Sequence, residues 1–90
     1  MNILQTNVDE FIKEMDWSYF ETKEIIEKIK EEVLEMEVEV TSGDREKLEI
    51  EAGDALFAFS CLCNKNAIDM DIALAKAIAK NRIRDRDRYK

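Results

Sequence analysis

Apolar residues recur at helical spacing near the start of the chain. The i, i+3, i+4, i+7 pattern of one helix face is carried by Val8, Phe11, Ile12 and Met15. It predicts a first helix over residues 3–16, whose regular part Thr6 or Asn7 can cap. An aromatic corner follows this helix, formed by Trp17, Tyr19 and Phe20.

A second amphipathic stripe predicts a helix over residues 22–41. Its apolar positions fall within an arc of about 100° at the helical period and are Ile25, Ile26, Ile29, Val33, Met36 and Val40. Thr22 is a suitable cap for its start. Gly43 is expected to end it, because a glycine just past a helix end readily adopts the left-handed conformation. Asp44 can then cap the next helix.

The third predicted helix, residues 45–64, changes character half-way along. From Ala55 to Cys63 it is apolar on nearly every side and is interrupted only by Ser60. A helix that is hydrophobic all round is normally buried. Burying every side of one helix in a chain of 90 residues calls for a second subunit. We therefore expect a homodimer or a homotetramer.

A fourth helix is expected to open at Asp69 or Asp71, after the polar turn at residues 64–66, and to run to residue 86. The chain has no proline and two glycines, which suits long helices joined by short connections. The sequence thus predicts a single all-α domain over residues 1–90. Its architecture is expected to be a four-helix bundle, assembled as a homo-oligomer.

Composition excludes several classes of protein. Residues 1–54 carry 17 acidic against 6 basic side chains, a net −11, whereas residues 55–90 carry 4 against 8, a net +4. Such an acidic first half argues against nucleic-acid binding. The apolar stretches are too short to span a membrane and the N-terminus does not resemble a signal peptide. Cys61 and Cys63 are expected to be buried free thiols, which fits a cytoplasmic location.

Among thirteen glutamates, the position on the helix distinguishes two acidic pairs. Glu32 lies about 20° outside the apolar arc of its helix, and Glu35 lies about 60° further round. An ionised carboxylate at such a border is costly unless it is paired or binds a cation. Glu51 and Asp54 stand at the same three-residue spacing on the next helix, just before its apolar run.

Two such pairs on adjacent antiparallel helices would form a cage of four carboxylates. Oxygen ligands without nitrogen or sulfur suit Mg²⁺, with Mn²⁺ as a possible substitute. A ferritin-like di-iron site would need histidine ligands, and the chain contains no histidine.

These elements resemble those of a known family. Residues 31–35, Glu-Glu-Val-Leu-Glu, resemble the E-E-x-x-E element of MazG-type nucleotide pyrophosphohydrolases. Residues 51–57, Glu-Ala-Gly-Asp-Ala-Leu-Phe, resemble the family's E-x-G-D-x-L-F element. Lys80 and Arg84 match the basic residues of its last helix, and residues 17–20 its aromatic corner. The resemblance covers residues 17–88.

The resemblance implies Mg²⁺-dependent hydrolysis of a (deoxy)nucleoside triphosphate to the monophosphate and pyrophosphate, as in the removal of unwanted nucleotides. It implies that Glu32, Glu35, Glu51 and Asp54 are the metal ligands. Glu35 is our candidate to orient or deprotonate the attacking water. Lys80 and Arg84 would bind the outgoing phosphates, or would instead pair with acidic side chains. Trp17 would stack on the base or pack in the core, and Lys23 would reach a phosphate.

Two other functions remain open at this point. A phosphoribosyl-ATP pyrophosphohydrolase would use the same carboxylates with a different base pocket. A non-catalytic interaction or regulatory module of helices would need no metal at all. A panel of nucleotides separates the first alternative, and a metal-induced rise in melting temperature separates the second.

Overall fold

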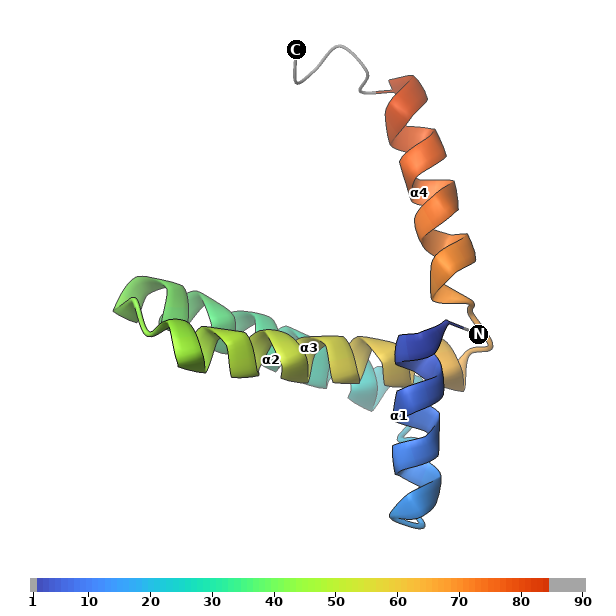
Figure 1. Ribbon diagram of the computed structural model, residues 1–90, viewed down its shortest axis with the longest axis horizontal. Coiled ribbons are helices and arrows are strands. Elements are labelled where there is room, and N and C mark those ends of the chain that lie inside the picture. The colour runs from blue at the N-terminus through green and yellow to red at the C-terminus, as the bar shows by residue number, and fades with distance from the viewer. Residues whose placement is uncertain (1, 85–90) are drawn as a thin grey trace.

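The computed structural model describes residues 2–84, and within that range it contains four α-helices and no strand. The helices are α1 (Ile3–Glu14), α2 (Thr22–Ser42), α3 (Arg45–Lys65) and α4 (Met70–Arg84). The helices α2 and α3 lie side by side as an antiparallel hairpin, which α1 crosses near the C-terminal end of α3 (Figure 1). The predicted all-α class with four helices is confirmed.

Two of the predicted helix termini are confirmed. Gly43 ends α2 with φ of 77°, the left-handed region, and its N–H donates to the carbonyl of Glu39. Asp44 then caps α3, because its Oδ1 accepts a hydrogen bond of 3.0 Å from the Lys47 N–H. The α2–α3 turn therefore consists of one glycine and one capping aspartate.

The caps of the first two helices differ from the prediction. Asn2, rather than Thr6 or Asn7, caps α1, and its Oδ1 accepts a hydrogen bond of 2.9 Å from the Gln5 N–H. Thr22 is the first residue of α2, after the position where a cap would stand. Both caps were misplaced because helical periodicity locates the middle of a helix better than its ends.

The start of α4 agrees with the sequence. The Asp69 carboxylate accepts hydrogen bonds from the backbone N–H groups of Asp71 and Ile72, at 2.9 and 3.2 Å. The predicted C-terminal limit at residue 86 lies outside the described residues.

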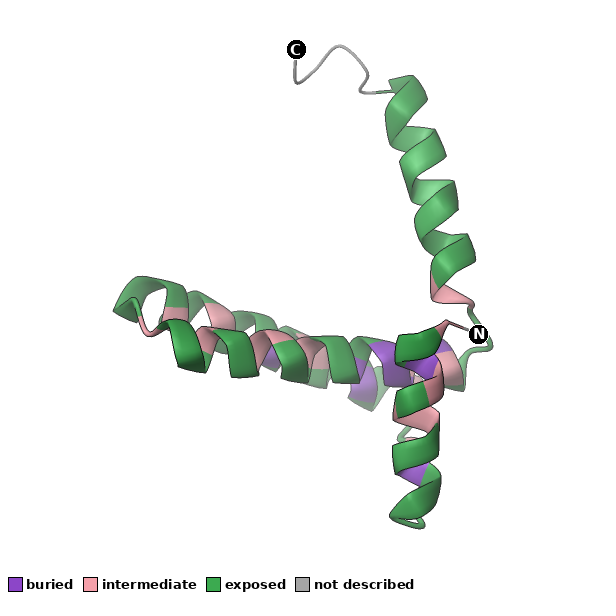
Figure 2. Cartoon of the chain, in the orientation of Figure 1, coloured by how far each residue is buried: buried purple, intermediate pink, exposed green. Residues whose placement is uncertain are grey.

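The core is small and lies where α1 crosses the α2–α3 hairpin (Figure 2). Ile12, Ile25 and Cys61 are buried there, one from each of these three helices. Partly buried side chains surround them, namely Val8, Tyr19, Ile29 and Leu62. Cys61 and Cys63 are buried and free, as predicted, and burial raises the pKa of both thiols.

A single chain does not bury the apolar half of α3. Its buried residues are Ala58, Ser60, Cys61 and Cys63. Its large side chains Leu56, Phe57 and Phe59 are exposed. In addition, α4 has no buried residue and points away from the other helices (Figure 1). The four helices therefore do not close into a bundle within one chain.

Candidate functional site

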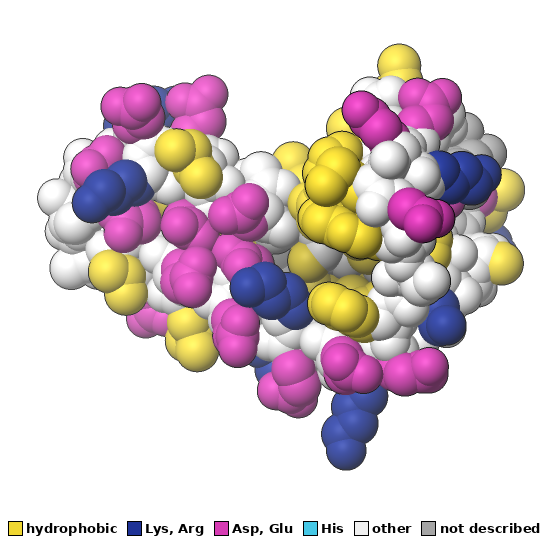
Figure 3. Space-filling view, turned by 90° about the horizontal axis from the view of Figure 1, so that it is seen from below, with side chains coloured by type: hydrophobic (Ala, Val, Ile, Leu, Met, Phe, Trp, Pro, Cys, Tyr) yellow, Lys and Arg dark blue, Asp and Glu magenta, His cyan; other side chains and the backbone are white. Residues whose placement is uncertain are grey.

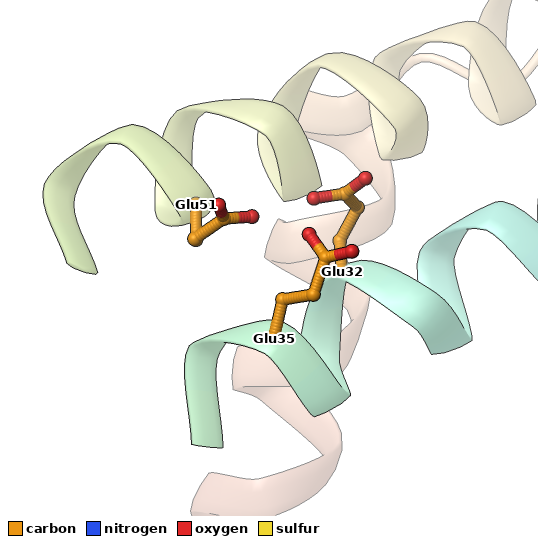
Figure 4. A group of neighbouring side chains, drawn as sticks. All are labelled: Glu32, Glu35 and Glu51. Carbon is orange, nitrogen blue, oxygen red and sulfur yellow. The ribbon is translucent and has the colours of Figure 1, made fainter. Parts of the chain in front are cut away.

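Three glutamates from two helices converge between α2 and α3. Glu32 and Glu35 project from neighbouring turns of α2, because residues three apart share a helix face. Glu51 reaches them from the antiparallel α3 (Figure 4). One carboxylate oxygen from each residue lies within 4.8 Å of the others. This convergence was expected from the sequence for all three.

The three carboxylates lie close enough together for their negative charges to repel one another. Glu32 is only 3% exposed. The Oε2 atoms of Glu32 and Glu51 are buried without a hydrogen-bond partner among the residues that the structure describes. Contact with Glu35, followed by burial and the neighbouring Glu32, raises the pKa of Glu51 to about 7. Like charges this close disfavour each other's ionised form.

These features suit a hard divalent cation. Mg²⁺ and Mn²⁺ prefer carboxylate oxygens, and two of these oxygens are buried without another partner within residues 2–84. A cation would neutralise the mutual repulsion that raises the pKa of Glu51. The donor set of Glu32, Glu35 and Glu51 thus fits the metal expected from the sequence.

Asp54 does not join this group of oxygens. It lies one turn beyond Glu51 on α3, is exposed, and lines the cavity next to the glutamates. The structure therefore brings together three of the four carboxylates of the expected cage and sets the fourth at the cavity wall. The longer glutamate side chains reach across the helix interface, whereas aspartate is one methylene shorter.

The cavity has a volume of about 960 Å³ and lies between the end of α1, the aromatic corner and the α2–α3 hairpin. Its walls are formed by apolar side chains, among them Ile12, Trp17, Phe20, Ile25 and Phe57. Five carboxylates also line it, namely Asp16, Glu24, Glu31, Glu32 and Asp54. Figure 3 shows acidic side chains crowded over the α2–α3 hairpin, beside apolar side chains at α1. Small-molecule sites combine apolar walls with a few polar groups in this way.

The aromatic corner shapes one wall of the cavity. The Trp17 ring stands edge-on to Phe11 with 5.5 Å between ring centroids, and Phe11 in turn packs edge-on against Phe57 at 5.9 Å. Trp17 is still 53% exposed. Of the two roles left open for Trp17, lining a ligand cavity agrees better with this exposure than burial in the core.

Lys28 is a site residue that the sequence reasoning missed. Its Nζ lies 3.2 Å from Oε1 of the buried Glu32 and 3.6 Å from Oε2 of Glu31, and it lines the cavity. Contact with Glu32 raises the pKa of Lys28. The i, i+4 spacing of Lys28 and Glu32 was the available signal, since such pairs face each other on a helix.

The other predicted basic residues lie elsewhere. Lys23 is exposed on the first turn of α2 and is not among the described residues that line the cavity. Lys80 and Arg84 are exposed on α4, which points away from α2 and α3 (Figure 1). The Arg84 guanidinium donates to Asn81 on its own helix at 3.2 Å. Within one chain, these cations do not face the carboxylates.

Comparison with known proteins identifies the family. Residues 20–89 match the family model described as the MazG nucleotide pyrophosphohydrolase domain. The chain belongs to the MazG family. The chain is also similar to the uncharacterized protein YpjD of Bacillus subtilis (strain 168), with 29% identity over 99 aligned positions. That alignment covers 99% of this chain and 89% of the relative. No solved structure gives a significant match.

The MazG match includes α2, α3 and α4, and hence all four carboxylates, Lys80 and Arg84. It begins after Trp17, so α1 and most of the aromatic corner lie outside it. Membership of the MazG family supports a nucleotide pyrophosphohydrolase activity and agrees with a metal-binding acidic cluster. None of the four described helices has the length and apolar composition of a transmembrane helix.

Proposed function

We propose that this chain is a Mg²⁺-dependent hydrolase that cleaves a (deoxy)nucleoside triphosphate to the monophosphate and pyrophosphate, and so clears unwanted nucleotides. The observation that carries the proposal is the convergence of Glu32, Glu35 and Glu51 beside a cavity of about 960 Å³. Two of their oxygens are buried and have no hydrogen-bond partner in the described part of the chain. A nucleoside triphosphate is highly anionic, so an acidic site can hold it only through cations. The MazG match supports the same substrate class.

We propose different roles for the four carboxylates. Glu32, Glu35 and Glu51, assisted by Asp54 at the cavity wall, would hold the metal. When bound, Mg²⁺ supplies charge neutralisation of the phosphates and a more acidic water. Glu35 is the exposed member of the three and can contact water from the solvent side, so we assign to it the acceptance of the attacking water's proton.

The cavity is proposed to bind the rest of the substrate. Trp17 offers an exposed ring at the cavity wall, and such rings stack on bases of any sequence. Lys80 and Arg84 remain our candidates to bind the outgoing phosphates, because guanidinium and ammonium groups suit phosphate oxygens. Lys23 remains a prediction without support from the cavity geometry.

The test is a nucleotide panel. Pure protein is incubated with Mg²⁺ and each of the common ribo- and deoxyribonucleoside triphosphates, several modified ones and phosphoribosyl-ATP. Monophosphate and pyrophosphate are then measured as products. We expect stoichiometric pyrophosphate from at least one nucleoside triphosphate. No turnover of any of these substrates would overturn the proposal, and turnover of phosphoribosyl-ATP alone would favour the alternative enzyme.

Matched glutamine variants assign the site. Glu35→Gln and Glu51→Gln should each lower kcat by about 100-fold or more, as losses of acid–base and metal-binding groups do. Glu37→Gln and Glu49→Gln change exposed glutamates two residues away on the same helices and should keep near-normal kcat. Near-normal activity of Glu35→Gln or Glu51→Gln would show that the reaction occurs elsewhere.

A further inference from the structure

The cavity has one end suited to charged groups. Glu32 lines it there, is 3% exposed, and has an Oε2 atom without a hydrogen-bond partner within residues 2–84. Lys28 is the single cation among the described residues that line the cavity, and its Nζ lies 3.2 Å from Oε1 of Glu32. A metal ion and the phosphates of a nucleotide therefore fit this end best.

The other end of the cavity is formed by the aromatic corner. The corner leads directly into the first turn of α2, where Glu24 also lines the cavity. Glu24 precedes Glu32 by eight residues, which is about 12 Å along the helix axis. A nucleotide whose phosphates lie near Glu32 can extend over this length, and its base then meets the rings of Trp17 and Phe20.

Asp16 lines the cavity directly before Trp17, on an anchored piece of backbone. Its φ is 57°, in the left-handed region that glycine usually occupies at a helix end and that aspartate tolerates. The Asp16 N–H donates to the Lys13 carbonyl and the Trp17 N–H donates to the Ile12 carbonyl, each at 3.0 Å. A short side chain on such a backbone is well ordered before a ligand arrives.

The free polar side chains at the corner are mainly acceptors. The carboxylates of Asp16 and Glu24 make no hydrogen bond or ion pair with another residue in the described part of the chain. An ionised carboxylate can only accept. The Tyr19 hydroxyl is already occupied, because it donates its hydrogen to Asp9 at 2.7 Å and accepts from Asn64 at 3.0 Å.

Two donors at the corner do not alter this balance. The indole N–H of Trp17 lies in the plane of its ring, so a base stacked on the ring face does not meet it. The Ser18 hydroxyl can donate or accept and therefore favours neither kind of base. The edge of a base that enters the corner consequently faces acceptors that need a hydrogen-bond donor.

We propose that Asp16 accepts a hydrogen bond from an exocyclic amino group of the base, so that the chain selects nucleotides of cytosine, adenine or guanine over those of uracil and thymine. Uracil and thymine carry a carbonyl oxygen where cytosine carries its amine, and two acceptors would then face each other. Their ring N–H lies between two carbonyl oxygens, which a carboxylate would also approach. This assignment rests on the proposed function, since a nucleotide substrate is what brings a base to the corner.

Two matched pairs of nucleotides test the preference. The triphosphates of deoxycytidine and deoxyuridine differ in one amino or carbonyl group, and so do those of deoxyadenosine and deoxyinosine. Their affinities are measured by calorimetry in Ca²⁺, used to slow turnover. In at least one pair the amino-bearing nucleotide should bind about 10-fold or more tightly. Absence of this preference from both pairs, weak binding of all four included, would overturn the proposal.

An amide at the same position should change the preference. Asp16→Asn tolerates the left-handed backbone and adds a donor, so the two members of a pair should bind within about threefold of each other. The carbonyl-bearing nucleotide should gain affinity. Glu14→Gln removes the same charge from an exposed position outside the described cavity lining and should keep the wild-type ratio. An unchanged ratio in Asp16→Asn would overturn the proposal.

A glycine variant separates recognition from a structural role. Asp16→Gly suits the positive φ and should melt close to the wild-type temperature. It should bind the amino-bearing nucleotide about 10-fold more weakly. Retention of the preference in this variant would contradict the role of the carboxylate. Loss of the preference only in variants that melt much earlier would show that the helix end is responsible, and would also overturn the proposal.

Turnover distinguishes this assignment from the proposed function. Hydrolysis of both members of each pair with equal kcat/KM would keep the proposed function and overturn the role of Asp16. Binding with the amino preference by a protein that hydrolyses no nucleotide would reject the proposed function and keep Asp16 as a base-recognition residue.

Discussion

The side-chain oxygen of Gln5 accepts a hydrogen bond of 2.8 Å from the backbone N–H of Met70, 65 residues away in the sequence. This contact ties the first helix to the start of the last one. The Asn64 side chain adds to it by donating to the Gln5 carbonyl and to the Tyr19 hydroxyl, each at 3.0 Å. The orientation of α4 therefore depends on side chains outside α4.

Replacement of this glutamine should loosen the α1–α4 connection. Gln5→Met keeps the length of the side chain but leaves the Met70 N–H and the Asn64 amide with fewer partners. We expect the free energy of unfolding to fall by about 1–3 kcal/mol in urea titrations at one fixed protein concentration. Glu10→Met, at an exposed position of α1, should change it by less than about 0.5 kcal/mol. Equal effects of the two variants would contradict the role of Gln5.

The pKa of Glu51 predicts how the metal-free protein responds to pH. This pKa is raised from 4.5 to about 7 in the folded chain. A carboxyl group with a raised folded-state pKa stabilises the fold below its unfolded pKa, and that contribution is lost as the pH rises through the folded pKa. In EDTA, the melting temperature should therefore fall more between pH 4.5 and 8 in wild type than in Glu51→Gln.

Glu49→Gln is the matched control for this measurement, because Glu49 is exposed on the same helix. It should retain the full wild-type pH dependence. Saturating Mg²⁺ should raise the melting temperature of wild type at pH 8 and that of Glu51→Gln by less, because binding to the folded state stabilises it. The same pH dependence in all three metal-free proteins would show that Glu51 does not titrate in this range.

Lys28 is expected to compensate the buried Glu32 when no metal is bound. Lys28→Met removes the cation 3.2 Å from Glu32 and should lower the melting temperature of the metal-free protein. Mg²⁺ should then restore stability, so the metal-induced rise should be larger than in wild type. Lys30→Met removes a pair between exposed side chains, Lys30 and Glu27, and should change stability by about 0–1 kcal/mol. A smaller metal-induced rise in Lys28→Met would contradict this role.

Trp17 provides a direct signal for ligand binding, since it is the single tryptophan of the chain and lines the cavity. A nucleotide that stacks on its ring should change its fluorescence during a titration in Ca²⁺, used to slow turnover. Trp17→Ala should weaken nucleotide binding by about 1–3 kcal/mol, measured by calorimetry. Trp17→Phe keeps a ring and should recover most of this loss. Unchanged fluorescence at saturating nucleotide would place the base elsewhere.

Local patterns were sufficient to predict the helices and the convergence of three glutamates. Gly43 and Asp44 define the α2–α3 turn. Glycine readily adopts the left-handed conformation that ends α2, and the aspartate side chain caps the start of α3. The convergence of Glu32, Glu35 and Glu51 follows from three-residue spacing on two helices joined by that turn. Each of these features depends on residues close in sequence or on a single short connection.

The remaining features depend on contacts between distant residues. The first residue of α4 donates to Gln5, whose polar side chain at a buried position carries no periodic signal. The separation of Asp54 from the three glutamates is a matter of three-dimensional side-chain positions, which a helical wheel does not contain. The apolar run of α3 predicts burial against a second subunit, which stays a prediction, and a single chain exposes Phe59 and Leu56.

The two-residue turn at Gly43 has a consequence for the order of folding. It joins two long helices whose contacts nearest the turn are local in sequence, and pairing that begins there is fast. We infer that the hairpin, with its repelling glutamates, forms in a fast step that is independent of protein concentration. The expected association of chains would follow in a slower bimolecular step. Divalent cations present during synthesis would then act on the nascent hairpin before any second copy arrives.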